Sequence, residues 1–172
     1  MEHRTYRDLH AHIAALEQKG LLVRVKRPIN KDTEMHPLVR WQFRGGIPES
    51  ERKGFLFENV IDSAGRRYDI PVAVGILASN REIYSLGIGC KVEDIKKQWD
   101  YAEQHQIEPV LVANPPCQEI VVEGEALNAP GKGVDGLPIP ISTPGFGRRS
   151  ICTCPPGWST SRAGSAKRTR FT

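Results

Sequence analysis

The chain has 172 residues, a formal net charge of +4 and 39% hydrophobic residues, which suits one domain or one small domain and part of another. No run of about 18 apolar residues occurs, so a membrane-spanning protein is not expected. The N-terminus lacks an apolar signal core, and we therefore expect a cytoplasmic protein.

The first element is predicted to be a helix over residues 6–19. Thr5 followed by Asp8 resembles a capping box, with Asp in place of the usual Glu, and Gly20 offers a stop. Between them, apolar side chains recur at helical spacing at Leu9, Ile13 and Leu16.

A strand and a second helix are predicted next. The strand covers residues 21–25 (LLVRV), and Pro28 is expected to end it. Asp32 or Thr33 can cap the helix, and the two glycines at 45–46 can close it.

Two strands and two helices follow in alternation. The alternating stretch 54–60 (GFLFENV) predicts a strand, and 69–77 (DIPVAVGIL) predicts a second, buried one. Asn80 can cap a short helix that continues through Leu86, and apolar residues three or four apart predict an amphipathic helix over 92–105.

The pattern changes after residue 105 to apolar runs and Pro/Gly-rich loops, with a strand predicted over 118–124 (QEIVVEG). The fold class predicted from this order is α/β (α+β). We divide the chain into an α/β domain at 1–113, the start of a β-rich domain at 114–147, and a tail at 148–172 that is expected to be disordered.

The tail differs from the rest of the chain in charge. It contains six of the 24 basic residues and none of the 20 acidic ones, so residues 1–147 hold 18 basic and 20 acidic residues. A basic tail can bind phosphates without sequence specificity, so an anion-binding or nucleic-acid-binding protein is one alternative. No aromatic interleaving or recognition motif supports it.

No motif of the chain assembles a catalytic, cofactor-binding or metal site. Glycines at 87 and 89 lack the third glycine of a dinucleotide fingerprint, and the loop around Lys132 lacks the spacing of a phosphate loop. Cys152 and Cys154 form a lone C-x-C without a partner pair, which favours reduced thiols. The histidines considered as metal ligands stand alone or on different helix faces: His10, His12, His36 and His105.

Several stretches resemble, in order, the UbiD-type decarboxylases, the family that contains 3-polyprenyl-4-hydroxybenzoate carboxy-lyase. They begin with YRDLHAHIAALEQKGLLVRVKRPIN and TEMHPLVRWQFRGG, and continue with FLFENV and IPVAVGILASNREIYSLGIG. PCQEIVVEGEAL and LPIPISTPG resemble the family's lead into its central domain. The connector NAPGKGVDG is longer than the family's usual link.

The resemblance implies a flavoprotein lyase (a carboxy-lyase) that removes CO2 reversibly from an aromatic or α,β-unsaturated acid, such as a 4-hydroxybenzoate-type acid. It implies prenylated FMN held with manganese (Mn2+) and potassium (K+), a cofactor domain with a split β-barrel fold, and a homo-oligomer. The cofactor supplies the chemistry and the protein orients and tunes it.

The family's functional residues come after the Leu-Pro motif, so the resemblance assigns none to this chain: catalytic none, cofactor-binding none, metal none. From Arg148 the tail departs from the family pattern, and GRRSICTCPPG stands where an Asp-Ala-Ala/Gly-Pro-Tyr segment is expected. A frameshift or truncation near codon 147 would explain this, and the chain would then be a fragment that is inactive alone. The alternatives are a natural short variant and a non-catalytic α/β interaction module.

Overall fold

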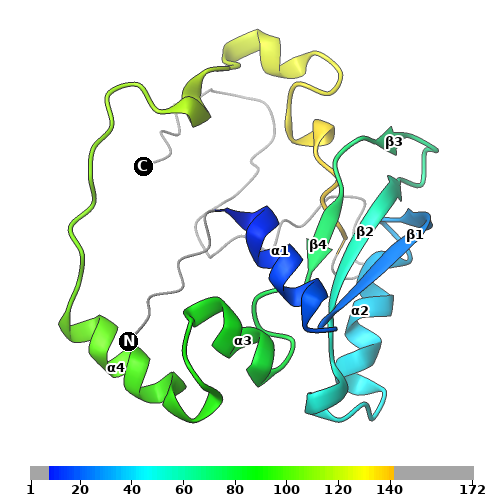
Figure 1. Ribbon diagram of the computed structural model, residues 1–172. Helices are drawn as coiled ribbons and strands as arrows, with labels where there is room; N and C mark the ends of the chain where they lie inside the picture. Colours follow the sequence, from blue (N-terminus) through cyan, green and yellow to red (C-terminus); the bar gives the residue numbers. More distant parts are fainter. Residues whose placement is uncertain (1–7, 142–172) are drawn as a thin grey trace.

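A mixed four-stranded sheet forms the centre of the structure, a computed structural model that describes residues 8–141 (Figure 1). Strand β1 (Leu22–Asn30) runs parallel to β2 (Gly54–Ile61), and β3 (Arg67–Tyr68) and β4 (Val72–Val74) pair with β2 in the antiparallel sense. Helix α2 (Met35–Arg44) connects the two parallel strands, as a crossover between parallel strands requires. The α/β fold class is therefore confirmed. The predicted tail disorder lies outside the described residues.

Strand β1 is longer than predicted, because Pro28 does not end it. Residue pairing with β2 shifts between Val25 and Pro28 and then continues to Asn30. Among the described strands β1 pairs with β2 alone, and an edge strand tolerates the missing N–H of proline, especially at a bulge. The Asn59 side chain donates to the carbonyl of Lys26 and bridges the irregular stretch.

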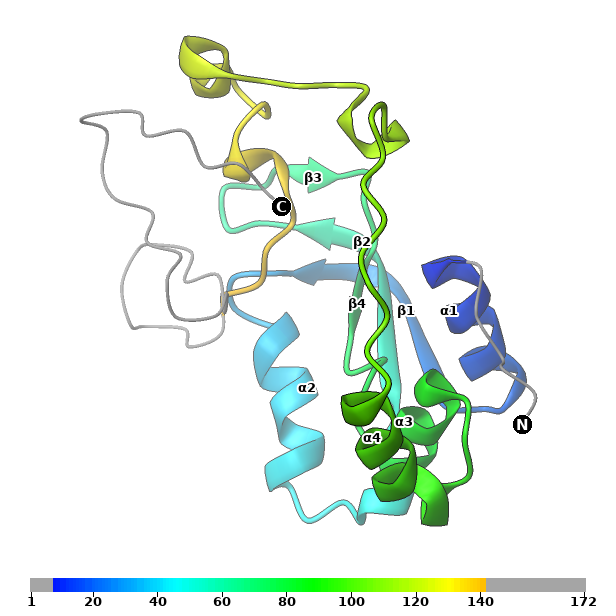
Figure 2. The same cartoon turned by 90° about the vertical axis from the view of Figure 1, so that its left-hand side faces the viewer.

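Helix α2 covers one face of the sheet (Figure 2). Its Met35 and Val39 pack in a cluster with Ile29, Phe57 and Val60, all of them buried. Neither Asp32 nor Thr33 caps this helix, so that prediction was wrong. The N-cap position belongs to Glu34, whose side chain makes no cap bond, and Asp32 instead accepts hydrogen bonds from elsewhere.

Helix α1 (Leu9–Gln18) and helix α3 (Arg81–Ile88) lie on the opposite face (Figure 2). A second cluster there joins side chains of both helices to the loops beside the sheet: Leu16, Leu21, Ile76, Ile83 and Leu86. The start predicted for the first helix was wrong, because Asp8 has extended backbone and is itself the N-cap, accepting from the Ala11 N–H at 2.9 Å. Thr5 lies outside the described residues.

The remaining helices follow α3. Asn80 caps α3 as predicted, and Gly89 ends it in the left-handed conformation, with φ of 78°. The helix predicted over 92–105 divides into a 3₁₀ turn, η2 (Val92–Asp94), and α4 (Ile95–Gln104). The predicted strand over 69–77 is limited to the three residues of β4, because Gly75 turns the chain with φ of 73°.

Residues 105–141 leave the end of α4 as an extended chain with three 3₁₀ turns and return beside β3 (Figure 1). The turns are η3 (Pro116–Gln118), η4 (Gly124–Asn128) and η5 (Val134–Gly136); a further one, η1 (Glu49–Glu51), precedes β2. The strand predicted over 118–124 was wrong. No described strand lies beside this stretch to pair with its backbone groups. Within residues 8–141, none of the helices has the length and apolar character needed to cross a bilayer.

Candidate functional site

Large apolar side chains are exposed in the part of the chain between α4 and η4. Six of them are exposed by 61% to 97%: Ile107, Val110, Leu111, Val112, Ile120 and Val121. We call residues 107–125 the linker segment. Single exposed apolar side chains are ordinary on a protein surface, whereas a contiguous exposed apolar patch marks an interaction surface.

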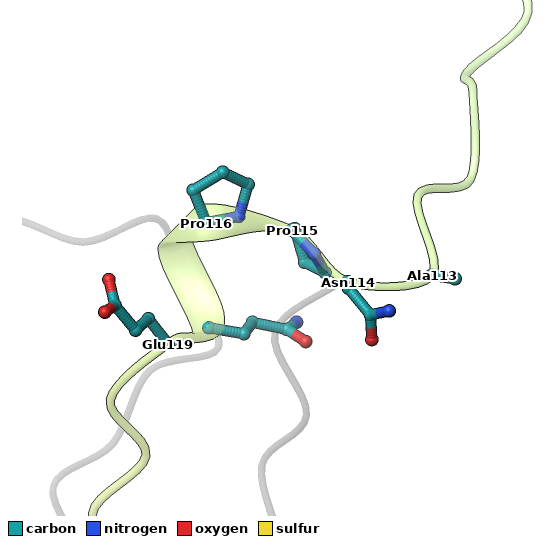
Figure 3. Close-up of a pocket in the computed structure, with 6 residues that line it drawn as sticks. Ala113, Asn114, Pro115, Pro116 and Glu119 are labelled. Atoms are coloured by element: carbon teal, nitrogen blue, oxygen red, sulfur yellow. The ribbon is translucent and has the colours of Figure 1, made fainter.

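A hollow of about 390 Å³ lies within the linker segment (Figure 3). Its walls come from a single turn, and Asn114 and Glu119 lie on opposite sides of it (Figure 3). A ligand site normally gathers polar groups from several elements around an apolar cavity. This hollow instead has one carboxylate and no cationic group. Its lining residues are Ala113, Asn114, Pro115, Pro116, Gln118 and Glu119.

A second cavity, of about 340 Å³, lies beside β4 and contains no charged residue among those that line it. Ser79 is 2% exposed, and its Oγ has no hydrogen-bond partner in the described structure. Gly75 is required nearby, because a Cβ at this position would lie 2.2 Å from the Ser79 Oγ. The other residues that line this cavity are apolar: Phe43, Ala73, Ile76, Leu77 and Ala78.

A polar contact ties the returning chain to the β2–β3 turn. Arg66 donates to the backbone carbonyl of Asp135 at 2.9 Å, and its Nη1 lies 3.5 Å from the Asp135 carboxylate. The backbone N–H of Gly131 donates to the same carboxylate at 2.9 Å. This N–H, together with Arg66, lowers the pKa of Asp135. We call these contacts the Arg66–Asp135 clasp.

The chain is held a second time where the described residues end. The Ile141 N–H donates to the carbonyl of Lys31, whose side chain is nine-tenths buried. The Lys31 Nζ lies 2.7 Å from Asp32, and Asp32 also accepts from the Ser63 N–H at 3.0 Å. Burial alone would raise the pKa of Asp32, but these hydrogen bonds outweigh it and lower the pKa. Sequence reasoning missed both contacts, since no local pattern pairs residue 66 with residue 135.

The histidines considered as ligands are dispersed. His12 is buried, with its Nε2 2.8 Å from the carbonyl of Ile76, and His10 is exposed. His105 stacks on Tyr101 at the end of α4, and burial, with Arg40 nearby, lowers the pKa of His36. Within residues 8–141 there is no group of three or more His, Cys, Asp or Glu side chains that could hold a metal.

The remaining described residues with possible chemical roles lie at a helix end or in turns. Gly87 and Gly89 belong to the end of α3, and Lys132 lies in the turn before η5. Burial raises the pKa of the Cys90 thiol, helped by Asp94 and Glu93, so this thiol is not activated. Residues 152 and 154 lie outside the described residues.

The helices on both faces of a mixed sheet define a small α/β domain, and its sequence identifies the family. The sequence model of the 3-octaprenyl-4-hydroxybenzoate carboxy-lyase N-terminal domain (UbiD_N) matches residues 13–100, slightly more than half of the chain. The chain therefore belongs to the UbiD family.

Solved structures of UbiD-class enzymes are similar to the chain. HmfF from Pelotomaculum thermopropionicum, in complex with FMN, is 29% identical over 77% of this chain, with a TM-score of 0.55. An evolved dimeric form of HmfF with prFMN is 26% identical over 58% of this chain and 20% of that chain, with a TM-score of 0.46. Vanillic acid decarboxylase of Sedimentibacter hydroxybenzoicus, in its open form, is 21% identical over 68% of this chain and 24% of that chain, with a TM-score of 0.49. The chain spans about a quarter of the length of the FMN-bound HmfF chain, 26%.

The described residues do not fit the cofactor and metals that the family implies. A flavin phosphate needs converging N–H groups or cations, and manganese needs several oxygen or nitrogen ligands. Neither cavity contains a cationic side chain, and residues 8–141 contain no cluster of metal ligands. We therefore assign no step of cofactor chemistry to them.

Proposed function

We propose that this chain is the N-terminal portion of a prenylated-FMN-dependent decarboxylase. The intact enzyme would remove CO2 reversibly from an aromatic or α,β-unsaturated carboxylic acid, such as a 4-hydroxybenzoate-type acid. The observation that carries the proposal is the UbiD_N match over residues 13–100, supported by the similarity to HmfF. On this proposal the protein is cytoplasmic and its intact form is a homo-oligomer.

In this proposal residues 1–113 are the N-terminal domain, residues 114–147 begin the split-barrel cofactor domain, and residues 148–172 are an atypical tail. Prenylated FMN, Mn2+ and K+ would be held by residues of the intact enzyme that follow this portion. The exposed linker segment supports the division, because a segment that enters another domain would have its apolar side chains covered there. The 172-residue chain alone would then be inactive.

The test compares two gene products made in a host that supplies prenylated FMN. One is the 172-residue chain, and the other is the product of the same gene after the coding DNA beyond codon 140 has been sequenced and any frame change repaired. Release of CO2 from a panel of aromatic and unsaturated acids is measured. We expect turnover by the repaired product alone. Turnover by the 172-residue chain, or the lack of any reading frame that continues the family, would refute the proposal.

The exposed linker segment also favours a second function, that of a non-catalytic interaction module. In this case the chain would bind a full-length UbiD-type enzyme through residues 107–125. Size-exclusion chromatography of the purified chain mixed with such an enzyme checks this. A shared peak that is lost on replacing Val110 and Leu111 by Ser would support binding, and separate peaks would exclude it.

A further inference from the structure

The linker segment combines exposed apolar side chains with charge of one sign. Its acidic residues are all exposed, and it contains no Lys or Arg. None of these carboxylates forms an ion pair with a described residue, whereas Asp135, further along, pairs with Arg66. The acidic residues are Glu108, Glu119, Glu123 and Glu125.

The tail has the opposite character. Residues 148–172 contain six basic residues and no acidic ones, together with the large apolar side chains Ile151, Trp158 and Phe171. An acidic surface with exposed apolar groups is complementary to a basic segment with apolar groups, because charge aligns the two and apolar contact adds affinity. We propose that residues 148–172 dock onto the linker segment of the same molecule.

The connection between the two segments favours docking within one molecule. Ile141 is hydrogen-bonded to the carbonyl of Lys31, so the tail starts a few residues from a fixed point of the domain. Tethering by a short connection gives effective concentrations of about millimolar, which makes even weak contacts form within the molecule. The proposal goes beyond the decarboxylase assignment and does not depend on it.

Carbodiimide crosslinking of the full chain tests the contact. The reagent joins an amine to a nearby carboxylate with loss of water, and Lys167 is the one lysine of residues 148–172. We expect monomeric chains in which Lys167 is joined to glutamates of the linker segment, identified by mass spectrometry. The yield should fall severalfold between about 0.02 M and about 1 M NaCl, since salt shortens the range of charge attraction.

Two variant sets with equal charge change provide the comparison. E108Q/E119Q/E123Q/E125Q keeps the shape of the linker segment and removes its charge. E51Q/E82Q/E93Q/D69N removes four exposed carboxylates elsewhere, and K167R removes the reactive amine while it keeps the charge. Because these variants also remove groups that the reagent needs, docking is measured by a second method. One dye on the tail and one on the linker segment report the separation of the two by energy transfer.

We expect energy transfer to fall in the linker variant and to persist in the other two variants. Crosslinks of Lys167 mainly to carboxylates outside residues 107–125 would overturn the proposal. Equal energy transfer in both four-residue variants would also overturn it, as would crosslinks found in dimers alone. If the tail forms no crosslinks within the molecule and the chain retards duplex DNA in a gel, the tail would instead be assigned to nucleic-acid binding. None of these results depends on catalytic activity, so they leave the decarboxylase proposal to its own test.

Discussion

Ser79 and Asp32 show how two polar side chains of one small domain, one buried and one partly buried, have opposite energetic roles. The Asp32 carboxylate accepts from both Lys31 and Ser63, whereas the Ser79 hydroxyl has no partner in the described structure. A buried polar group without a partner costs free energy, and one with several partners adds to stability. The two positions should therefore respond in opposite directions to removal of the polar atom.

Replacing Ser79 by Ala should stabilise the protein. The variant removes a hydroxyl without a partner and keeps the Cβ, so we expect the free energy of unfolding to rise by about 1 kcal/mol. Urea denaturation followed by circular dichroism measures it. The matched variant Ser63→Ala removes an exposed hydroxyl and should change stability much less, and a loss of stability in Ser79→Ala would show that the hydroxyl has a partner.

Replacing Gly75 by Ala should be costly for two reasons. Its φ of 73° disfavours any side chain, and the new Cβ would clash with Ser79. We expect a loss of about 3 kcal/mol in the free energy of unfolding, of which the left-handed conformation accounts for about 1–2 kcal/mol. Gly65→Ala is the control, because its φ is 83° but no atom lies within 4 Å of the added Cβ. Equal losses at the two positions would rule out the clash.

The pKa of Asp32 predicts how stability depends on pH. The folded state holds this pKa below its ordinary value of about 3.9, so the carboxylate stabilises the fold above that pH. The contribution is lost as the pH falls through about 4 toward the lowered folded pKa. Unfolding measured from pH 6 to about pH 2 should show a smaller decline for Asp32→Asn than for the unchanged chain. Asp69→Asn, at an exposed position without an ion pair to a described residue, should leave the decline as it was.

At the scale of elements, the sequence predicted a helix or strand correctly where the contact that determines it lies within a few residues. Asn80 as a cap and the alternation of residues 54–60 were both readable from the sequence. The predictions failed where a residue far away in the sequence determines the local structure. Ser63, which is 31 positions away, donates to the Asp32 side chain, and the edge position of β1 lets the strand continue through Pro28.

The candidate site was harder to predict than the fold. The Arg66–Asp135 clasp joins residues 69 positions apart, and neither residue belongs to a motif. The linker segment was predicted to contain a strand over residues 118–124. Strand formation also needs a neighbouring strand, and the described chain offers none beside it.

The cap of α3 gives a prediction at this scale. Asn80 Oδ1 accepts from the Ile83 N–H at 2.7 Å, and its Nδ2 donates to the carbonyl of Arg52 at 2.6 Å. Asn80→Ala should lower the free energy of unfolding by about 2 kcal/mol, since it removes both contacts. Asp8→Ala, at the exposed cap of α1, should cost about 1 kcal/mol. A larger loss at Asp8 would contradict the assigned roles.

For the whole molecule, the main feature is the division between the part of the chain that packs a core and the part that exposes its apolar side chains. All the buried residues of the two apolar core clusters lie between Leu16 and Leu86. Residues 105–125 make no regular sheet or α-helix and expose their apolar groups. The chain thus has a stable portion followed by one whose backbone is accessible, and these portions should differ in their resistance to proteases.

Limited proteolysis should therefore cut first within residues 105–130. With a protease of broad specificity we expect a resistant product that retains α1 through α4, identified by its mass. The Gly75→Ala variant serves as the comparison, because its weakened fold should shorten the lifetime of this product. Early cuts between β1 and β2, in the unchanged chain, would contradict the division.

The position of the buried side chains also has a consequence for biosynthesis. Because both core clusters are complete by Leu86, everything needed to pack the sheet has left the ribosome while later codons are still being translated. Domains generally fold in this vectorial manner, N-terminal part first. A change in the mRNA downstream of the codons for the sheet would then alter only the C-terminal sequence, because the nascent domain would already have folded. A gene of this kind can acquire a different ending without losing the fold at its beginning.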